Sequence, residues 1–242
     1  MEISSTEVQN NFGQYLKLAQ FEDIIVTKNG KKAVVIKPYE ESAVGCSAVA
    51  ERAESYDWKN EKISYEDFLK LSEESENRYE YIDGEVYLLS SPSYDHQNII
   101  VEMLNVFYNY FKGKKCRPLT APFDVTLTKE KDKNVVQPDI IVICDTVNIN
   151  EKGRYTGVPT LVVEVLSAST QKKDMLKKLN LYLCSGIEEY WIVNPMRKEV
   201  YTYCFAEQDI KDYRAHKTAE AVESMTFEGL EISLRQIFSS GQ

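Results

Sequence analysis

The stretch Leu161–Leu166, "LVVEVL", decides how the chain must fold, because it sets a carboxylate inside an apolar run. Five of its six residues are aliphatic, which is typical of a strand buried on both faces of a sheet. The upstream stretch "QPDIIVIC", residues 137–144, repeats the pattern, with Asp139 leading into a second apolar run. A buried carboxylate is costly unless a partner compensates its charge. If the two strands pair, Asp139 and Glu164 converge at one edge of the sheet.

Two acids held close together repel each other unless a cation lies between them. Mg²⁺ meets this need, because it is a hard ion that takes carboxylate oxygens and keeps waters for a phosphate substrate. Mn²⁺ is the expected substitute. The alternative is structural: each carboxylate is satisfied by backbone donors or by an arginine. For the pair in this order of elements, we favour the metal.

The composition is that of an ordinary globular protein with one large or two small domains: 242 residues, 43% hydrophobic and 28% charged. We see no apolar leader and no run near the ~20 residues of a membrane helix, so we expect a cytoplasmic protein without a membrane partner. The five cysteines lie far apart and only two histidines are present. This pattern disfavours a zinc site and indicates reduced thiols.

The formal net charge of −9 argues against a protein that coats nucleic acid non-specifically. It remains compatible with binding through a local basic patch or through a divalent metal. Any nucleic-acid surface must therefore be local.

Residues 1–40 form a first predicted unit. Ser4 and Glu7 have the spacing of a capping box, and the stretch that follows carries its apolar residues largely on one side of a helix. Asn29-Gly30 is a strong hairpin signal between two β-rich runs. A short strand, a helix and a hairpin bury little apolar surface, so we expect this unit to dimerise or to dock.

The stretches "ISSTEVQNNFGQYLKLA" and "IIVTKNGKKAVVI" resemble the Phd-type antitoxin domain, a small dimeric DNA-binding fold of prokaryotic toxin–antitoxin operons. The resemblance implies a homodimer whose paired N-terminal strands and helices bind operator DNA. Transferred by position, it brings Ser5, Thr6, Gln9 and Asn10 near DNA. The alternative is that these residues only cap and solvate a helix.

Residues 41–62 are small, polar and acidic, and we interpret them as a linker. In the antitoxin family the corresponding tail binds a toxin, so the resemblance implies a toxin-like partner at this segment. The linker separates the antitoxin-like unit from a larger domain at residues 63–242.

The larger domain is predicted to combine helices and strands (α/β, with the mixed sheet of an α+β fold), and its helices are expected to pack on the sheet. A helix begins after Ser64, a hairpin turns at Asp83-Gly84, and a long amphipathic helix has Asp95 at its start. The remaining expected elements are strands at 116–128, 135–144 and 160–167, a helix at 171–185, and strands in "EEYWIVNP" and "EVYTYCF".

Six ordered motifs carry a second resemblance: "RYEYIDGEVY", "PSYDHQNI", "QPDIIVI", "VVEVLSAST", "KDMLKKLNLY" and "GIEEYWIVNP". Together they resemble the restriction-endonuclease family of Uma type, within the P-D…(D/E)-x-K nuclease superfamily. The resemblance implies a restriction-endonuclease-like core and Mg²⁺-dependent DNA cleavage, with Asp139 and Glu164 as metal ligands. Glu80 matches the family's acidic position and would complete the metal shell, whereas Glu85, directly after the turn, is the weaker choice.

The superfamily pattern has a lysine two residues after the second acid, where this chain has Leu166. That lysine would orient or deprotonate the attacking water, so a replacement must reach the same site. In the helix at 171–185, Lys178 lies about 100° from the centre of the apolar arc and can reach back to the sheet. Lys177 lies about 160° away and is expected to face water. We predict Lys178 as the migrated lysine; the alternative is an i,i+4 pair with Asp174.

His96 is expected in the first turn of its helix, on the face that points to the sheet. It would bind the scissile phosphate or act as a base, and a core or capping histidine is the alternative. Ser167, Ser169 and Thr170 follow the second acid and would offer hydroxyls and a helix N-terminus to a phosphate, although plain N-caps are the simpler interpretation.

Three functions are compatible with these patterns. The first is a Mg²⁺-dependent DNA endonuclease fused to an antitoxin-like module, with Asp139, Glu164, Lys178 and His96 as catalytic residues. The second is a regulator that binds operator DNA and whose nuclease-like domain has lost its chemistry. The third is an RNA-directed or repair nuclease on the same scaffold. The intact acidic pair favours an enzyme over a regulator.

Overall fold

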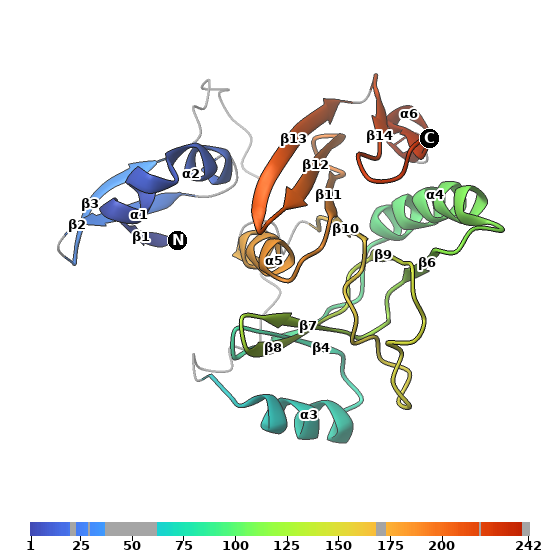
Figure 1. Cartoon of the computed structure of the whole chain (residues 1–242), viewed down its shortest axis with the longest axis horizontal. Coiled ribbons are helices and arrows are strands. Elements are labelled where there is room, and N and C mark those ends of the chain that lie inside the picture. The colour runs from blue at the N-terminus through green and yellow to red at the C-terminus, as the bar shows by residue number, and fades with distance from the viewer. Residues whose placement is uncertain (20–22, 29, 37–61, 168–172, 218, 239–242) are drawn as a thin grey trace. The chain divides into compact units, whose positions relative to one another are not determined.

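The computed structural model describes residues 1–19, 23–28, 30–36, 62–167, 173–217 and 219–238, and the predicted linker therefore lies outside it except for Lys62 (Figure 1). The chain divides into two compact units: an N-terminal one of residues 1–53, to which residues 170–176 are also assigned, and a second of residues 54–169 and 177–242. Within the described residues, no helix has the length and apolar character needed to span a membrane.

The N-terminal unit is a three-stranded sheet with two short helices. Its elements are β1 (Glu2–Ser4), α1 (Ser5–Asn10), α2 (Phe12–Leu18), β2 (Ile24–Lys28) and β3 (Lys31–Ile36). The middle strand, β2, is parallel to β1 and antiparallel to β3. Ser4 is the N-cap as predicted, because its side chain accepts a hydrogen bond from the Glu7 N–H at 3.2 Å. The expected single helix is interrupted at Asn11, which caps α1 outside the helical region.

The second unit contains two main sheets. Its elements are α3 (Tyr65–Glu74), β4 (Tyr79–Ile82), β5 (Glu85–Leu88), α4 (Tyr94–Phe111), β6 (Arg117–Thr120), β7 (Val125–Lys129), β8 (Asp132–Val136), β9 (Ile140–Ile143), β10 (Leu161–Val165), α5 (Lys173–Cys184), β11 (Glu189–Asn194), β12 (Glu199–Ala206), β13 (Asp209–Lys217), β14 (Ala221–Glu223), β15 (Glu231–Ser233) and α6 (Leu234–Phe238). One sheet has the order β13-β12-β11-β10-β9-β6 and the other β5-β4-β8-β7, beside a β14-β15 ribbon. In the six-stranded sheet β10 and β11 are parallel and the other pairs antiparallel, so the predicted mixed sheet is confirmed.

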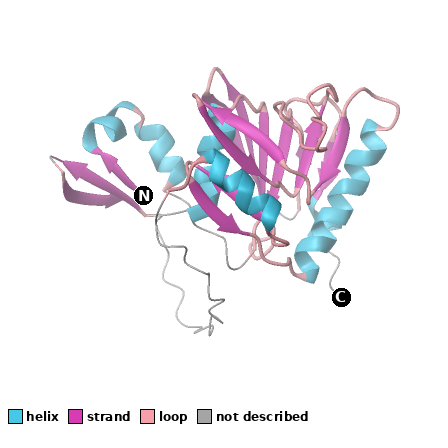
Figure 2. Cartoon of the chain, turned by 90° about the horizontal axis from the view of Figure 1, so that it is seen from below, coloured by secondary structure: helices cyan, strands magenta, loops and turns pink. Residues whose placement is uncertain are grey.

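Helices cover both faces of the six-stranded sheet (Figures 1 and 2). Consecutive residues of β11 make this clear, because neighbours in a strand point to opposite faces. Trp191 meets Phe107 of α4, with ring centroids 5.7 Å apart. Tyr190 meets Tyr182 of α5 on the other face, at 4.9 Å. The main apolar core lies on the α4 face, and Glu164 points to the α5 face, where the Tyr182 hydroxyl reaches it.

Two of the predicted strands are divided in the structure. The run expected at 135–144 becomes the end of β8 and the whole of β9, which belong to different sheets. Pro138 lies between them, and a proline cannot donate a ladder hydrogen bond. The run expected at 116–128 is divided between β6 and β7, on either side of a cis Ala121-Pro122 bond. Strands β13–β15 and helix α6 were not among the predicted elements.

The prediction of reduced thiols is wrong for one pair of cysteines. Cys116 and Cys144 form a disulfide across 28 residues of sequence. They flank the register pair Arg117–Ile143 of the antiparallel strands β6 and β9, so strand pairing brings them opposite each other. Sequence spacing alone does not contain that register. Cys184 and Cys204 are free thiols, and Cys46 lies outside the described residues.

Candidate active site

Strands β9 and β10 bring Asp139 and Glu164 to the same end of the sheet. Ile140 pairs with Val163 in the antiparallel register, so the residue before β9 stands beside the residues at the end of β10. Asp139 Oδ2 accepts a hydrogen bond from the Val165 N–H at 2.7 Å. The predicted pairing of the two strands is confirmed. Burial is the main cause that raises the pKa of Glu164, and the negative charge of Asp139 adds to the rise.

The ammonium group of Lys178 lies between two carboxylates. Its Nζ is 2.9 Å from Glu80 Oε1 and 3.0 Å from Glu164 Oε1. All three residues are buried, with exposed fractions of 4% for Glu80, 9% for Glu164 and 8% for Lys178. The buried carboxylate of β10 thus has a cationic partner on α5, the helix from which the sequence predicted a replacement lysine. The alternative partner, Asp174, has a side chain outside the described part of the chain.

Burial and charge shift the pKa values of this cluster. Burial raises the pKa of Glu164 to about 7, because it disfavours the charged carboxylate, and Lys178 opposes the rise. Burial alone would lower the pKa of Lys178, but Glu164 and Glu80 outweigh it and raise the pKa. The lysine therefore stays charged at neutral pH.

Tyr182 fixes the Glu164 carboxylate from the same helix. Its hydroxyl donates to Glu164 Oε1 at 2.6 Å. Burial raises the pKa of Tyr182 well above its usual value, so the hydroxyl remains a proton donor. Tyr182 was not among the site residues predicted from the sequence. The available signal was its spacing, because residues four apart on a helix share a face, and Lys178 precedes it by four.

His96 lies against Asp139. It follows the N-cap Ser93 in the first turn of α4, is buried, and places Nε2 3.3 Å from Asp139 Oδ2. Burial tends to lower the pKa of His96, but the hydrogen bond and the charge of Asp139 outweigh it and raise the pKa overall. Its Nδ1 is buried without a hydrogen-bond partner among the described residues. The predicted inward orientation is confirmed.

Glu80 connects the four-stranded sheet to the site. Besides the Lys178 ammonium, its Oε1 accepts the Gln137 N–H at 2.8 Å. The segment between β8 and β9 is therefore held at both ends, at Gln137 by Glu80 and at Asp139 by the Val165 N–H. Strand β4, the segment between β8 and β9, and helix α5 are distant in sequence and meet at Glu80.

The prediction that Lys177 faces water is wrong. Its Nζ is 2.6 Å from Glu85 Oε2 and donates to the Tyr87 hydroxyl, and its side chain is 33% exposed. The angle of about 160° places Lys177 relative to the apolar side of α5 alone. It contains no information about the β4–β5 hairpin, which packs near this lysine. Of the two glutamates of this hairpin, Glu85 pairs with Lys177, and Glu80 pairs with Lys178, the lysine that also contacts Glu164.

The acids provide a donor set that fits a divalent cation. Asp139 Oδ1 and Glu164 Oε2 make no hydrogen bond within the described residues, and both are hard carboxylate oxygens. Mg²⁺ is usually bound by one or two carboxylates, with waters and substrate phosphates as its other ligands. In the part of the chain that the structure describes, no three His, Cys, Asp or Glu residues form a ready-made metal cluster. The arrangement fits an open two-carboxylate site and not a closed protein cage.

The other predicted site residues are less fully described. The four residues expected near DNA all belong to α1, where Thr6 is exposed and Ser5 half-buried. The side chains of Gln9 and Asn10 lie outside the described part of the structure. Ser167 is half-buried directly after β10, and Ser169 and Thr170 are outside the described residues.

A mixed sheet with one acid on a strand, a second acid directly before the neighbouring strand and a buried lysine beside them defines a restriction-endonuclease-like protein. The chain belongs to the Uma2 family, whose model, described as "Putative restriction endonuclease", matches residues 65–235. Residues 1–43 match the model of the Phd_YefM antitoxin of type II toxin–antitoxin systems. Both resemblances predicted from the sequence are confirmed.

Two similar proteins come from Synechocystis sp. and Anabaena variabilis. An uncharacterised protein of Synechocystis sp. is 30% identical over 143 residues, which cover 59% of this chain and 74% of that protein. A crystal structure from Anabaena variabilis, described as "a putative nuclease belonging to DUF820", is similar with a TM-score of 0.61 and 24% identity, covering 73% of this chain and 98% of that chain. At this identity the second likeness concerns the fold alone.

Proposed function

We propose that this protein is a metal-dependent endonuclease that hydrolyses phosphodiester bonds in DNA. The observation that carries the proposal is the position of Lys178, whose ammonium is 3.0 Å from Glu164 although the usual place for a lysine is occupied by Leu166. Phosphoryl transfer needs positive charge held where negative charge develops. A buried, always-charged ammonium beside an acid pair meets that need.

The side chains of this site have separate tasks in the proposal. A bound Mg²⁺ or Mn²⁺ would supply a Lewis acid and lower the pKa of a water. Asp139 and Glu164 hold the ion, and Glu80, whose Oε2 makes no hydrogen bond within the described residues, is the candidate third ligand. Lys178 donates to a phosphoryl oxygen or orients the attacking water, while Tyr182 fixes Glu164.

His96 acts through Asp139 in this proposal. Its Nε2 already contacts Asp139 Oδ2, so the ring orients the carboxylate and shares its charge. This is the task of a positioning residue. A direct contact between His96 and the scissile phosphate would use Nδ1, which is buried and has no partner among the described residues.

The antitoxin-like unit would deliver the nuclease to DNA as a dimer. Its edge strand β3 exposes Val34 at 58% and Val35 at 48%. Exposed valines on an unpaired edge strand favour association with a second copy. Helix α1, with Ser5, Thr6, Gln9 and Asn10, would then contact DNA.

The test uses purified protein on supercoiled plasmid with Mg²⁺, Mn²⁺ or EDTA. We expect nicked or linear product with metal and none with EDTA. Asp139→Asn and Glu164→Gln, which keep side-chain size and remove the charge, should abolish cleavage. Product formation in EDTA, or by both variants, would contradict the proposal.

A catalytically inactive DNA-binding regulator of a toxin–antitoxin type operon is the second candidate. One observation favours it: Lys178 compensates Glu80 and Glu164 without a metal. A chain that had lost its chemistry could retain such a buried ion-pair network for its fold. Wild-type protein that cuts nothing with either metal, yet protects an operator sequence from nuclease digestion, would favour this function.

A further inference from the structure

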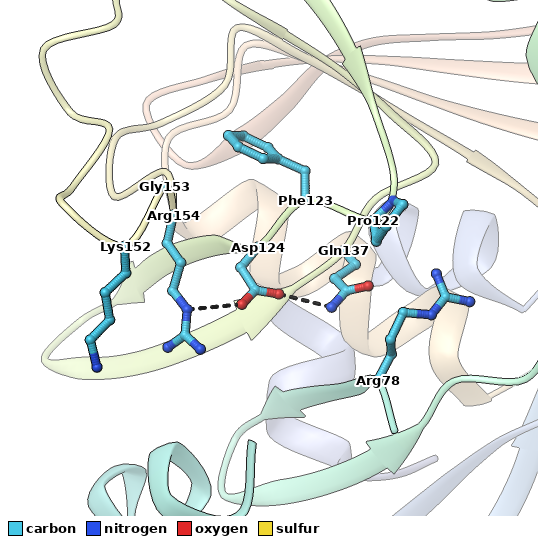
Figure 3. A pocket seen from close by; sticks show the side chains of 8 residues that line it. All are labelled: Arg78, Pro122, Phe123, Asp124, Gln137, Lys152, Gly153 and Arg154. Atoms are coloured by element: carbon cyan, nitrogen blue, oxygen red, sulfur yellow. Dashed lines mark hydrogen bonds and ion pairs between the residues drawn. The ribbon is translucent and has the colours of Figure 1, made fainter. Parts of the chain in front are cut away.

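A basic pocket opens in the second unit beside the segment that carries Asp139. The cavity has a volume of about 240 Å³ and is lined by Arg78, Pro122, Phe123, Asp124, Gln137, Lys152, Gly153 and Arg154 (Figure 3). We use "basic pocket" for the three cations Arg78, Lys152 and Arg154 around the pair Asp124 and Gln137. None of these residues was singled out as a site residue from the sequence.

The floor of the basic pocket is held by hydrogen bonds that leave the terminal nitrogens of Arg154 and the guanidinium of Arg78 available, whereas Lys152 is paired with Glu73. Asp124 accepts from Gln137 Nε2 at 2.8 Å and pairs with Arg154 Nε at 3.1 Å. The single acid of the pocket is therefore neutralised through Arg154 Nε, and the terminal nitrogens of Arg154 remain. Gln137 Oε1 is buried without a partner among the described residues.

Arg78 is the least engaged cation of the pocket. Its guanidinium makes no hydrogen bond or ion pair within the described residues, and Figure 3 shows it on the opposite side of the Asp124–Gln137 pair from Arg154. Two guanidinium groups that flank one cavity suit a tetrahedral anion, because each presents a planar fork of donors.

The basic surface continues beyond this cavity. A second cavity of about 350 Å³ is also lined by Lys152 and Arg154 and adds Lys133. Its acid, Glu73, already pairs with Lys152. Across both cavities the cations outnumber the acids, in a chain whose net charge is −9. This is the kind of local basic patch that nucleic-acid binding requires of an acidic protein.

The basic pocket is linked to the candidate active site through Gln137. The side chain of Gln137 forms part of the pocket floor. Its backbone N–H donates to Glu80 Oε1, the oxygen that also receives the Lys178 ammonium. A nucleic-acid strand carries phosphates along its length, so one phosphate can lie in the basic pocket while another lies at the acids.

We propose that the basic pocket is a subsite for a backbone phosphate of the nucleic-acid strand, separate from the phosphate that is cut; this rests on the proposed nuclease function. Arg78 and Arg154 bind the phosphate oxygens, and Lys152, which is paired with Glu73, lies at the rim. Asp124 keeps Arg154 in position. Contact at a second phosphate fixes the strand's register over the acids.

Arg78→Gln tests the proposal, because Arg78 has no partner in the described structure to be left unpaired. The matched control is Arg235→Gln, which removes the same charge from an exposed position on α6. Both variants and the wild type are titrated with a labelled DNA duplex in EDTA, so that nothing is cut. Arg78→Gln should weaken binding about fivefold, the scale of one partly exposed ion pair. The slope of log affinity against log salt should become shallower by about 0.9, the value for one phosphate contact.

Unchanged affinity and slope in Arg78→Gln, or an equal change in Arg235→Gln, would overturn the proposal. Residues 1–43 are the same in all three proteins, so their contribution cancels in the comparison. Because binding is measured without cleavage, an inactive wild type would defeat the nuclease function and leave this result standing. If the pocket instead binds free phosphate compounds, inorganic phosphate should stabilise the wild type but not Arg78→Gln, and the two proteins should bind the duplex equally well. That result would also overturn the proposal.

Discussion

Replacing Lys178 with methionine tests whether its ammonium offsets the burial of the Glu80 and Glu164 carboxylates. Methionine keeps much of the packing of the lysine stem and removes the charge. Each carboxylate then loses a partner at 2.9 or 3.0 Å. Removing one partner of a buried ion pair costs about 3–5 kcal/mol. We expect the loss of unfolding free energy to lie in this range near pH 8.

The loss should be smaller at low pH. The pKa of Glu164 is about 7 with Lys178 present, above its ordinary value of 4.5, and it must rise further without the ammonium. A carboxyl group whose pKa is higher in the folded than in the unfolded state reduces stability as the pH rises above the unfolded value. Near pH 4.5 a proton on Glu164 replaces the missing cation, so the unfolding free energy of the variant should approach that of the wild type.

Urea unfolding without metal, at pH 5 and pH 8, measures both effects. Lys177→Met is the control, because it makes the same change one residue away, where the partner Glu85 has a side chain 40% exposed. It should cost about 1 kcal/mol or less. Lys178→Met should also slow cleavage by ~10²-fold or more, whereas Lys177→Met should not. Equal losses in the two variants, or a Lys178→Met loss independent of pH, would refute the reasoning.

His96→Gln removes a group whose pKa is raised in the folded state. The wild type therefore gains stability from His96 below about pH 6.5 and loses that gain as the pH rises through the folded pKa. Thermal melts should separate the two proteins more at pH 5.5 than at pH 8.5. An equal separation at both values would argue against the contact with Asp139. Glu189→Ala leaves the Met225 N–H and the Trp191 indole N–H without their acceptor, whereas the Thr226 N–H keeps the Ser224 hydroxyl oxygen; it should cost about 3 kcal/mol or more in urea unfolding, and a loss below about 1 kcal/mol would contradict this. Deleting residues 1–40 should leave a folded monomer in sedimentation, and an unchanged oligomeric state would exclude this unit from the assembly.

Local signals in the sequence predicted the elements that depend on local chemistry. Ser4 and Ser64 were expected as N-caps and accept hydrogen bonds from residues three positions on. The turn at Asp83-Gly84 was expected from its residue types, and both residues have positive φ, at 51° and 89°. Capping and tight turns involve residues within a few positions of one another, so the chain order alone contains the information.

Outcomes that depend on register between distant elements were not predictable in the same way. The disulfide between Cys116 and Cys144 follows from the pairing of β6 with β9. The partner of Lys177 lies on a hairpin 92 residues earlier in the chain. Asp139 is a similar case. If it only repelled Glu164, its removal should cost no unfolding free energy. In the structure it is the acceptor of the Val165 N–H, so its removal leaves a buried donor unpaired, at about 1–3 kcal/mol.

Two glutamates on the neighbouring strands β10 and β11 explain why an acid in a core strand is not by itself a functional signal. Glu189 is fully buried, and its oxygens accept from the Trp191 indole, the Ser224 hydroxyl and two backbone N–H groups. Among the described residues, Glu164 receives only the Tyr182 hydroxyl and the Lys178 ammonium, both on Oε1. Four neutral donors can carry a buried negative charge, and they leave no oxygen for a ligand. Glu164 keeps Oε2 without a hydrogen bond in the described structure, and it lies beside a fixed positive charge. The donors around each carboxylate therefore indicate its role. Glu189 stabilises the fold, and Glu164 is the acid that can bind a cation.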